Sequence, residues 1–260
     1  AAMQSAMGNV SRQFSGSLQY AVSTTAETTP DVLEAVSVAL KAMRAKKLLD
    51  QKSIRSEMLT SLIQALQECD SDTEHHVRST QALGSELGKR IHLSDHQQSQ
   101  LSLLCLLHDI GKIGIPDSVL NKPTQLTEDE DNLLKKHTII GAEILKDVTL
   151  IPHVVEATRN HHEHYDGSGY PDGLAGTEIP IYARIIAVAD CYDAMNSRRI
   201  YRNALSQDEI YEEILKNKGT QFDPEIADIF LTLLTENQIP DLDDFSESSS
   251  ISNLADDHRT

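Results

Sequence analysis

Hydrophobic and polar positions follow the period of α-helices along most of this chain. Leu33, Val36 and Leu40 fall at heptad spacing, and Leu62 and Leu66 lie four residues apart, on one helical face. The helical pattern continues to about residue 235, and no stretch shows the sustained alternation that is typical of strands. The pattern therefore predicts an all-α fold, in which amphipathic helices pack into a bundle.

Residues that begin helices recur along this pattern. Pro30 and Ser94 stand where a first helical turn would start. Residues 127–130 and 206–209 both match the capping box, in which a hydroxyl and an acid three residues later satisfy each other's backbone amides. Residues 223–224 are Asp-Pro, the combination that starts a last helix. These signals predict several short helices with defined N-termini.

The chain divides by composition into three parts. Residues 1–69 form a polar segment followed by an amphipathic helix, which either packs on its own domain or serves as a signalling or dimer helix. Residues 70–235 carry most of the helical pattern and form the main domain. Residues 236–260 contain seven acidic residues and a serine run, and we expect this tail to be disordered.

Charge and composition narrow the classes of function. The formal net charge is −17, which argues against a protein that binds duplex nucleic acid. Only 4% of residues are aromatic, which also favours helices over sheets. Cys69, Cys105 and Cys191 are not spaced as metal ligands, so we interpret them as reduced thiols of a cytoplasmic protein. No apolar run is long enough to span a membrane.

Histidines are concentrated in one part of the chain. Ten of the eleven lie between residues 75 and 164, and five of these stand in contexts that suggest ligands, together with two aspartates. Each alone would be read as a hydrogen-bonded core residue or a helix cap, but seven of them in one bundle could converge on metal ions. Imidazole and carboxylate ligands suit iron, manganese, zinc or nickel. The seven candidates are His75, His108, Asp109, His137, His161, His162 and Asp190.

The spacing of some candidates fits shared ions. Adjacent helical residues point roughly 100° apart, so His161 and His162 could bind one octahedral ion. Asp109 has two oxygens and could bridge two ions. The remaining histidines of this region are expected at the surface or behind the ligands; they are His76, His92, His96, His153 and His164.

Five segments together resemble one family. They are HHVR (75–78), LLHDIGKIGIPDSVLNKP (106–123), HTIIGAEIL (137–145), HHEHYDGSGYPDGL (161–174) and ARIIAVADCYDAMNSRRIYR (183–202). In this order they resemble the HD-GYP family of cyclic di-GMP phosphodiesterases, a branch of the HD metal-dependent phosphohydrolases. The resemblance covers about residues 70–235. It implies an all-helical HD-domain bundle, a site for two or three iron or manganese ions, and hydrolysis of cyclic di-GMP to linear pGpG, in some members onward to GMP.

The resemblance also implies roles for individual residues. The seven candidates above match the family's metal ligands, and Asp109 with Lys112 would take part in catalysis. Lys112 lies three residues after Asp109, so it can reach the same cavity and contact a phosphate or protonate the leaving oxygen. Arg199 and Arg202 follow Asp190 and are candidates for contacts with the other phosphate.

The name-giving motif Gly169-Tyr170-Pro171 is intact. Tyr170 offers a ring for stacking on guanine, Gly169 allows close backbone approach, and Pro171 fixes the turn. The family resemblance makes this loop a candidate surface for protein partners as well, and the N-terminal helix a candidate for a homodimer.

Two departures from the family pattern change the expectations. Members with three metals carry an acid one turn before the first histidine, and counted from His75 this position is Ser71, flanked by Asp70 and Asp72. We therefore expect two divalent ions per chain. Ile200 replaces the usual proline of the last motif, which we expect to alter only loop stiffness.

Three functions remain open from the sequence, besides a generic HD nucleotidase, against which the Gly169-Tyr170-Pro171 loop argues. The first is a cyclic di-GMP phosphodiesterase in which a water activated between two metal ions attacks the phosphate. The second is the same chemistry on 3′,3′-cyclic GMP-AMP, because nothing in the sequence fixes the second base. The third is a module that senses cyclic dinucleotides with little turnover, which the loss of a ligand would favour.

Overall fold

The computed structural model describes residues 73–148, 151–197 and 204–240, together with six positions between residues 57 and 66. The chain divides into two compact units, Ala1–Thr60 and Ser61–Thr260, and all the helices described below belong to the second. The expectations for the N-terminal amphipathic helix and for the tail from residue 241 onward lie outside the described residues.

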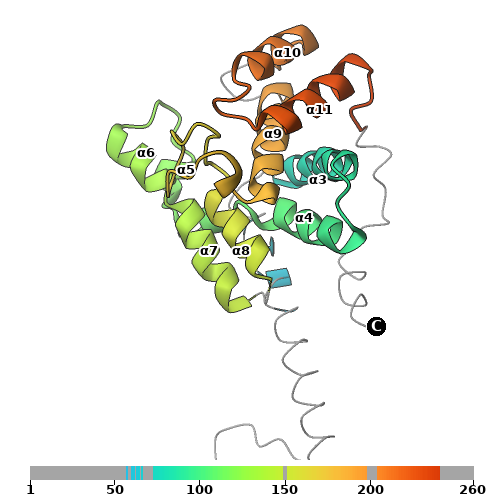
Figure 1. Cartoon of the computed structure of the whole chain (residues 1–260). Coiled ribbons are helices and arrows are strands. Elements are labelled where there is room, and N and C mark those ends of the chain that lie inside the picture. The colour runs from blue at the N-terminus through green and yellow to red at the C-terminus, as the bar shows by residue number, and fades with distance from the viewer. Residues whose placement is uncertain are drawn as a thin grey trace, which may run out of the picture. The chain divides into compact units, whose positions relative to one another are not determined.

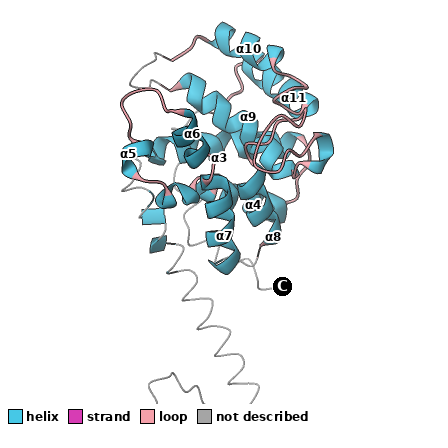
Figure 2. Ribbon diagram, turned by 90° about the vertical axis from the view of Figure 1, so that its left-hand side faces the viewer, coloured by secondary structure: helices cyan, strands magenta, loops and turns pink. Residues whose placement is uncertain are grey.

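The described part of the chain is helical, which confirms the all-α prediction (Figure 2). It contains no strand, and its sole β-type pairing is an isolated bridge between Lys218 and Phe222. The helices are α3 (Thr73–Arg90), α4 (Asp95–Leu107), η1 (Ile110–Gly114), α5 (Asp117–Leu120), α6 (Glu128–Leu134), α7 (His137–Val148), α8 (Pro152–Asn160), η2 (Gly176–Glu178), α9 (Ile181–Asn196), α10 (Gln207–Lys216) and α11 (Pro224–Thr235).

Helix starts follow the local signals of the sequence. Ser94, Thr127 and Ser206 each cap a helix through a complete capping box with the residue three positions later. Asp223 caps α11, where its side chain accepts hydrogen bonds from the backbone amides of Glu225 and Ile226. These predictions are confirmed because a cap depends only on neighbouring residues.

Helix α9 runs through the middle of the bundle (Figure 1). It packs on α3 and α8 and also contacts α10 and α11. Helix α7 packs on α8 and η1. The core between α3, α4 and α9 is built from aliphatic side chains such as Leu83, Leu104 and Ile185, each at most 1% exposed. Burial of each such side chain stabilises the fold by about 1.5–3 kcal/mol.

A close contact between η1 and α7 brings two site segments together. A Cβ at Gly111 would overlap the carbonyl oxygen of His137 and would lie 2.5 Å from the backbone nitrogen of Gly141. Only glycine allows this approach of the two backbones. The contact holds Asp109, which directly precedes η1, beside His137, the first residue of α7.

Two further observations concern the cysteines and membrane spans. Neither Cys105 nor Cys191 forms a disulfide bond among the described residues, and burial raises the pKa of the Cys105 thiol to about 12, so this cysteine is an unreactive core residue. Among the described residues, no helix combines the length and the apolar character that a membrane span needs.

Candidate metal centre

Two neighbouring groups of side chains present metal-binding atoms inside the bundle. The first is His76 of α3 with His108 and Asp109, where α4 ends and η1 begins. The Nε2 atoms of His76 and His108 lie 3.3 Å apart, and Nε2 of His108 lies 3.5 Å from Oδ2 of Asp109. Asp190 of α9 joins them, because its Oδ1 lies 3.7 Å from Nε2 of His76.

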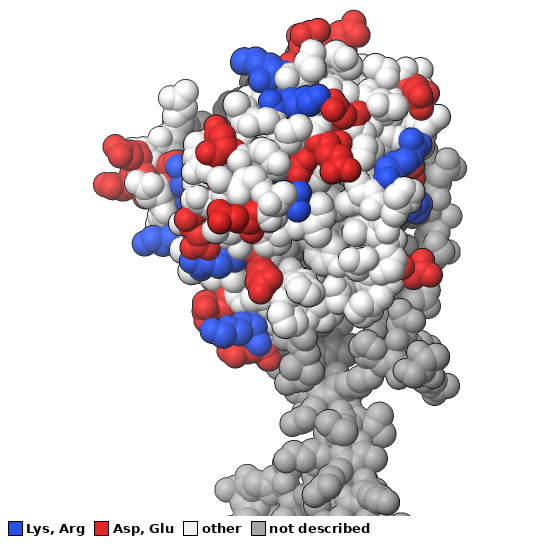
Figure 3. All heavy atoms as spheres, viewed as in Figure 1, with Lys and Arg blue, Asp and Glu red and all other residues white. Residues whose placement is uncertain are grey.

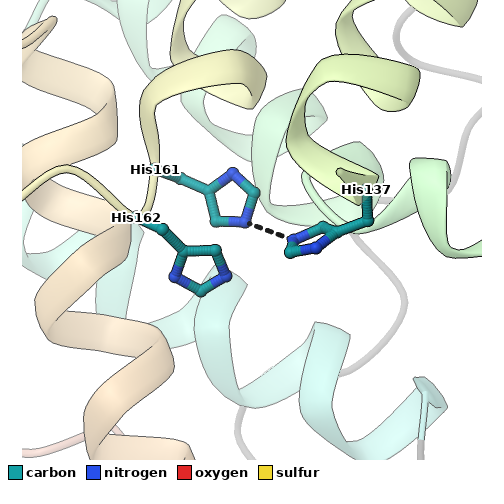
Figure 4. Close-up of side chains that lie close together, drawn as sticks. All are labelled: His137, His161 and His162. Carbon is teal, nitrogen blue, oxygen red and sulfur yellow. Dashed lines mark hydrogen bonds between the residues drawn. The ribbon is translucent and has the colours of Figure 1, made fainter. Parts of the chain in front are cut away.

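The second group consists of His137, His161 and His162 (Figure 4). His137 begins α7, His161 caps the C-terminus of α8, and His162 follows it. The Nε2 atoms of His137 and His161 lie 3.4 Å apart, and the ring centroids of His161 and His162 lie 4.1 Å apart. Figure 4 shows the three rings turned toward a shared space.

Asp109 lies between the two groups. Its Oδ1 lies 3.4 Å from Nε2 of His137 and 4.0 Å from Nε2 of His161, while Oδ2 faces His108. One carboxylate therefore offers an oxygen to each group, which is the arrangement that a bridge between two ions requires.

Backbone carbonyls fix the protonation of three of the rings. The Nδ1 atoms of His108, His137 and His161 lie 2.7–3.0 Å from the carbonyl oxygen three residues earlier in the chain. A carbonyl oxygen only accepts hydrogen bonds, so Nδ1 carries a proton, and in the neutral imidazole Nε2 is then left with a bare lone pair. This is the tautomer that binds a metal through Nε2.

The distance between the Nε2 atoms of His137 and His161 shows whether these residues fit a metal ion. When both rings are neutral, His137 and His161 turn two unprotonated Nε2 atoms toward each other at 3.4 Å, so the contact drawn between them in Figure 4 contains no proton of theirs. Two nitrogens that bind one ion at ~2.1 Å, with ~90–110° between the bonds, lie about 3.0–3.4 Å apart. The spacing and the donor set therefore fit a divalent metal ion.

The pKa shifts of the site residues also favour metal binding. Burial lowers the pKa of His108, lowers that of His162 to about 4, and lowers that of His161 well below its usual value, so all three rings are neutral near pH 7. Burial alone would raise the pKa of Asp109, but Lys112 and the surrounding histidines hold it well below its usual range. Neutral imidazoles beside an ionised carboxylate are the forms that bind metals.

The structure corrects the sequence prediction for the first histidine. His75 is exposed over 62% of its side chain and lies outside both groups, whereas His76, expected at the surface or behind the ligands, stands among them. Adjacent helical residues point about 100° apart, and within α3 it is His76 that faces the bundle while His75 faces outward. The buried stripe of α3 runs through Thr80, Leu83 and Leu87, and His76 precedes it at helical spacing. That stripe is the signal that identifies His76.

Sequence reasoning also missed Asp193. Its side chain is buried, and its Oδ2 accepts a hydrogen bond from Nδ1 of His76 at 2.9 Å. Burial alone would lower the pKa of His76, but this hydrogen bond and the nearby Asp190 raise it overall. Asp193 therefore orients His76 so that Nε2 points at His108. The signal was available, because Asp190 and Asp193 are three residues apart and share a face of α9.

The expected substrate contacts are placed in part. Nζ of Lys112 lies 2.7 Å from Oδ2 of Asp109, at the edge of the cluster. The ring of Tyr170 lies against His162, with centroids 5.1 Å apart and planes inclined by 30°. Gly169 and Pro171 flank this tyrosine, while Arg199 and Arg202 lie outside the described residues.

Comparison with known proteins places this chain in a family. The model of the HD domain family matches residues 57–226. The cyclic di-GMP phosphodiesterase response regulator RpfG of Xanthomonas campestris is 40% identical over 177 residues, which are 67% of this chain and 47% of that protein. A cyclic di-GMP phosphodiesterase of Thermotoga maritima is 36% identical over 215 residues, 78% of this chain and 58% of the relative.

Other similar proteins bear names of related activities. The 3′3′-cGAMP-specific phosphodiesterase 2 of Vibrio cholerae is 33% identical over 186 residues, 71% of this chain and 36% of that protein. The chain thus spans between about a third and three fifths of these relatives.

Solved structures share the fold. The crystal structure of a cyclic GMP-AMP specific phosphodiesterase of V. cholerae has a TM-score of 0.53 and 21% identity, covering 77% of this chain and 52% of that one. The HD domain of phosphodiesterase PgpH from L. monocytogenes has a TM-score of 0.50 and 19% identity, covering 68% and 98%. From the matched family model, these relatives and the shared motifs, the chain belongs to the HD domain family and to its HD-GYP branch.

Proposed function

We propose that this chain is a metal-dependent phosphodiesterase that hydrolyses cyclic di-GMP to linear pGpG. The observation that carries the proposal is the pair of histidine groups whose ring nitrogens flank the carboxylate of Asp109. The names of the relatives of Xanthomonas and Thermotoga support the choice of substrate. The N/O donor set, without cysteine, suits iron or manganese.

Metal ions bound here would lower the pKa of a water molecule and neutralise charge on the phosphate. The chain's own residues would hold the substrate and manage the remaining charge. Lys112 brings its ammonium group to the cluster, where it can bind a phosphate oxygen or donate a proton to the leaving ribose oxygen. Tyr170, beside His162, offers an aromatic face to a guanine base.

The negative net charge of the chain does not counter this proposal. Although the net charge is −17, acidic and basic side chains are interspersed over the face seen in Figure 3. Four expectations stay predictions: contacts of Arg199 and Arg202 with the second phosphate, protein partners at the Gly169-Tyr170-Pro171 loop, a dimer through the N-terminal helix, and a cytoplasmic location.

The direct test is to load the purified chain with manganese or iron under reducing conditions and incubate it with cyclic di-GMP. Chromatography should show linear pGpG, and a chelated sample should show none. Full metal occupancy without any linear product would favour the sensing module instead. A parallel incubation with 3′,3′-cyclic GMP-AMP tests the second candidate, which the V. cholerae relative supports.

Replacing Lys112 by alanine is expected to lower kcat by roughly 10²–10³-fold while the metal content stays the same, because a preorganised cation acts on the developing charge. Steady-state kinetics and metal analysis on the same preparation would measure both. Lys136→Ala is the matched control, since Lys136 is exposed and lies next to His137 in sequence. Equal kinetics for the two variants would remove Lys112 from the mechanism.

The expected number of metal ions depends on which histidine is the first ligand. The expectation of two ions rested on Ser71, counted from His75. Counted from His76, the residue four positions earlier is Asp72, which is an acid at the spacing where two side chains share a helical face. We therefore propose that the chain can bind a third ion.

Metal analysis of the wild type and of Asp72→Ala would test this count. We expect three ions per chain to fall to two in the variant, with Ser71→Ala as a neutral control. Two ions in the wild type and no change in Asp72→Ala would restore the earlier expectation of two.

A further inference from the structure

A buried carboxylate holds the loop that follows the second group of histidines. Glu163 is only 3% exposed. Its Oε1 accepts hydrogen bonds from the backbone amides of Asp172 and Gly173 at 2.6 and 3.0 Å, and its Oε2 accepts one from Leu174 at 3.1 Å. Three amides on one carboxylate form strong, charge-assisted bonds, so this part of the loop is tied to the residue that follows His162.

Other contacts attach the loop to the end of α8. The guanidinium of Arg159 donates two hydrogen bonds of 2.7 Å to the carboxylate of Asp172, and Asn160 donates a third at 3.1 Å. A Cβ at Gly169 would overlap the backbone nitrogen of His164 and lie 2.5 Å from Cα of Glu163. The loop backbone therefore crosses directly over Glu163, which only a glycine permits.

Tyr170 lies within the stretch that these contacts hold. It is flanked by Gly169, which touches Glu163, and by the segment from Asp172 whose amides bind the Glu163 carboxylate. Its backbone nitrogen donates to the carbonyl oxygen of His162 at 3.2 Å, and its ring lies against His162. On another side, Nζ of Lys135 lies 5.4 Å from the centre of the ring.

We propose that Glu163 is a positioning residue that keeps Tyr170 against the metal centre as a wall for an aromatic base of the substrate. The proposal rests on the proposed function for the nature of that base. The carboxylate contacts only loop amides among the hydrogen bonds described, and the carbonyls that orient His137 and His161 come from elsewhere. Its loss should therefore weaken substrate binding more than metal binding.

Glu163→Gln is the informative change, because it keeps the shape and removes the charge. A glutamine oxygen can still accept from two amides, but its NH₂ group would face the third amide, donor against donor. Because a charge-assisted bond to the loop is lost, we expect KM for cyclic di-GMP to rise by about 10-fold or more. We expect kcat to change by less than about threefold and the metal content to stay the same.

Glu178→Gln is the matched control, since it removes the same charge from an exposed position in the same connection between α8 and α9. Glu163→Asp is the conservative variant, which keeps the carboxylate and should recover part of the lost affinity. Wild-type KM in Glu163→Gln would overturn the proposal. So would a fall in metal content and kcat with KM unchanged, because Glu163 would then support the ligands and not the loop.

A second readout needs no turnover. The chain contains no tryptophan, so Tyr170→Trp introduces a single indole whose fluorescence reports on this loop. Adding Glu163→Gln to that variant should increase quenching of the indole by acrylamide, while adding Glu178→Gln should not. If the wild type fails to hydrolyse cyclic di-GMP, the proposed function fails, yet this quenching still decides the role of Glu163. Equal quenching in both double variants would overturn the positioning role.

Discussion

Replacing Asp109 by alanine is expected to abolish hydrolysis of cyclic di-GMP and to lower the metal content of the chain. The two oxygens of this carboxylate face different groups of imidazoles, at 3.4 Å from His137 and 3.5 Å from His108. Its loss removes the proposed bridge and leaves Lys112, whose side chain is 24% exposed, without its nearest anion. The net charge of the cluster would then be more positive by one, which disfavours binding of further positive ions.

Product chromatography and metal analysis on one preparation would measure both effects. Asp117→Ala is the matched control, because Asp117 is an exposed aspartate eight residues later in the same motif, in the first turn of α5. A variant at Asp109 that keeps full metal occupancy and normal turnover would contradict the assignment of this cluster as the catalytic centre.

The helices could be predicted from sequence because their signals are local. The capping boxes at Thr127 and Ser206 and the Asp223 cap involve residues within three positions of each other, and the structure has each of them. The long-range contacts that form the site cannot be predicted from such local signals. The close approach of Gly111 to Gly141, for example, depends on how η1 lies against α7.

Six of the seven residues predicted as ligands lie together in the structure. Some of them could be found from their places at helix ends, because His108 follows α4 and His137 begins α7. Their role as ligands stays a prediction. Glu163 was missed because its importance lies in hydrogen bonds to the loop amides, which no spacing along the chain reveals. Asp193, in contrast, could have been found from its spacing to Asp190.

The sequence prediction named His75 and not His76 for a different reason. Two adjacent histidines satisfy the same motif, and only the direction in which the helix buries its face separates them. Within α3, Leu83 and Leu87 are almost fully buried, and counting back from them by helical turns reaches His76 and not His75. A hydrophobic stripe is thus a better guide to register than the position of a residue in a motif.

The adjacent pair also gives the sharpest test of the site. His76→Ala is expected to remove metal and abolish turnover, because Nε2 of His76 lies 3.3 Å from that of His108 and 3.7 Å from Asp190. The change also deprives the buried Asp193 of its hydrogen bond at 2.9 Å, which adds a cost in stability of about 1–3 kcal/mol. Metal analysis, kinetics and thermal unfolding would separate these effects.

His75→Ala removes the same side chain one position earlier, so any difference between the two variants reflects the direction in which each imidazole points. We expect it to keep its metals and its activity, since His75 is largely exposed and its Nδ1 reaches no closer than 3.8 Å to Asp193. The opposite result, with metal lost in His75→Ala and kept in His76→Ala, would mean that α3 is rotated by one residue in the metal-bound protein. In that case the third-ion proposal through Asp72 would fall as well, because its spacing is counted from His76.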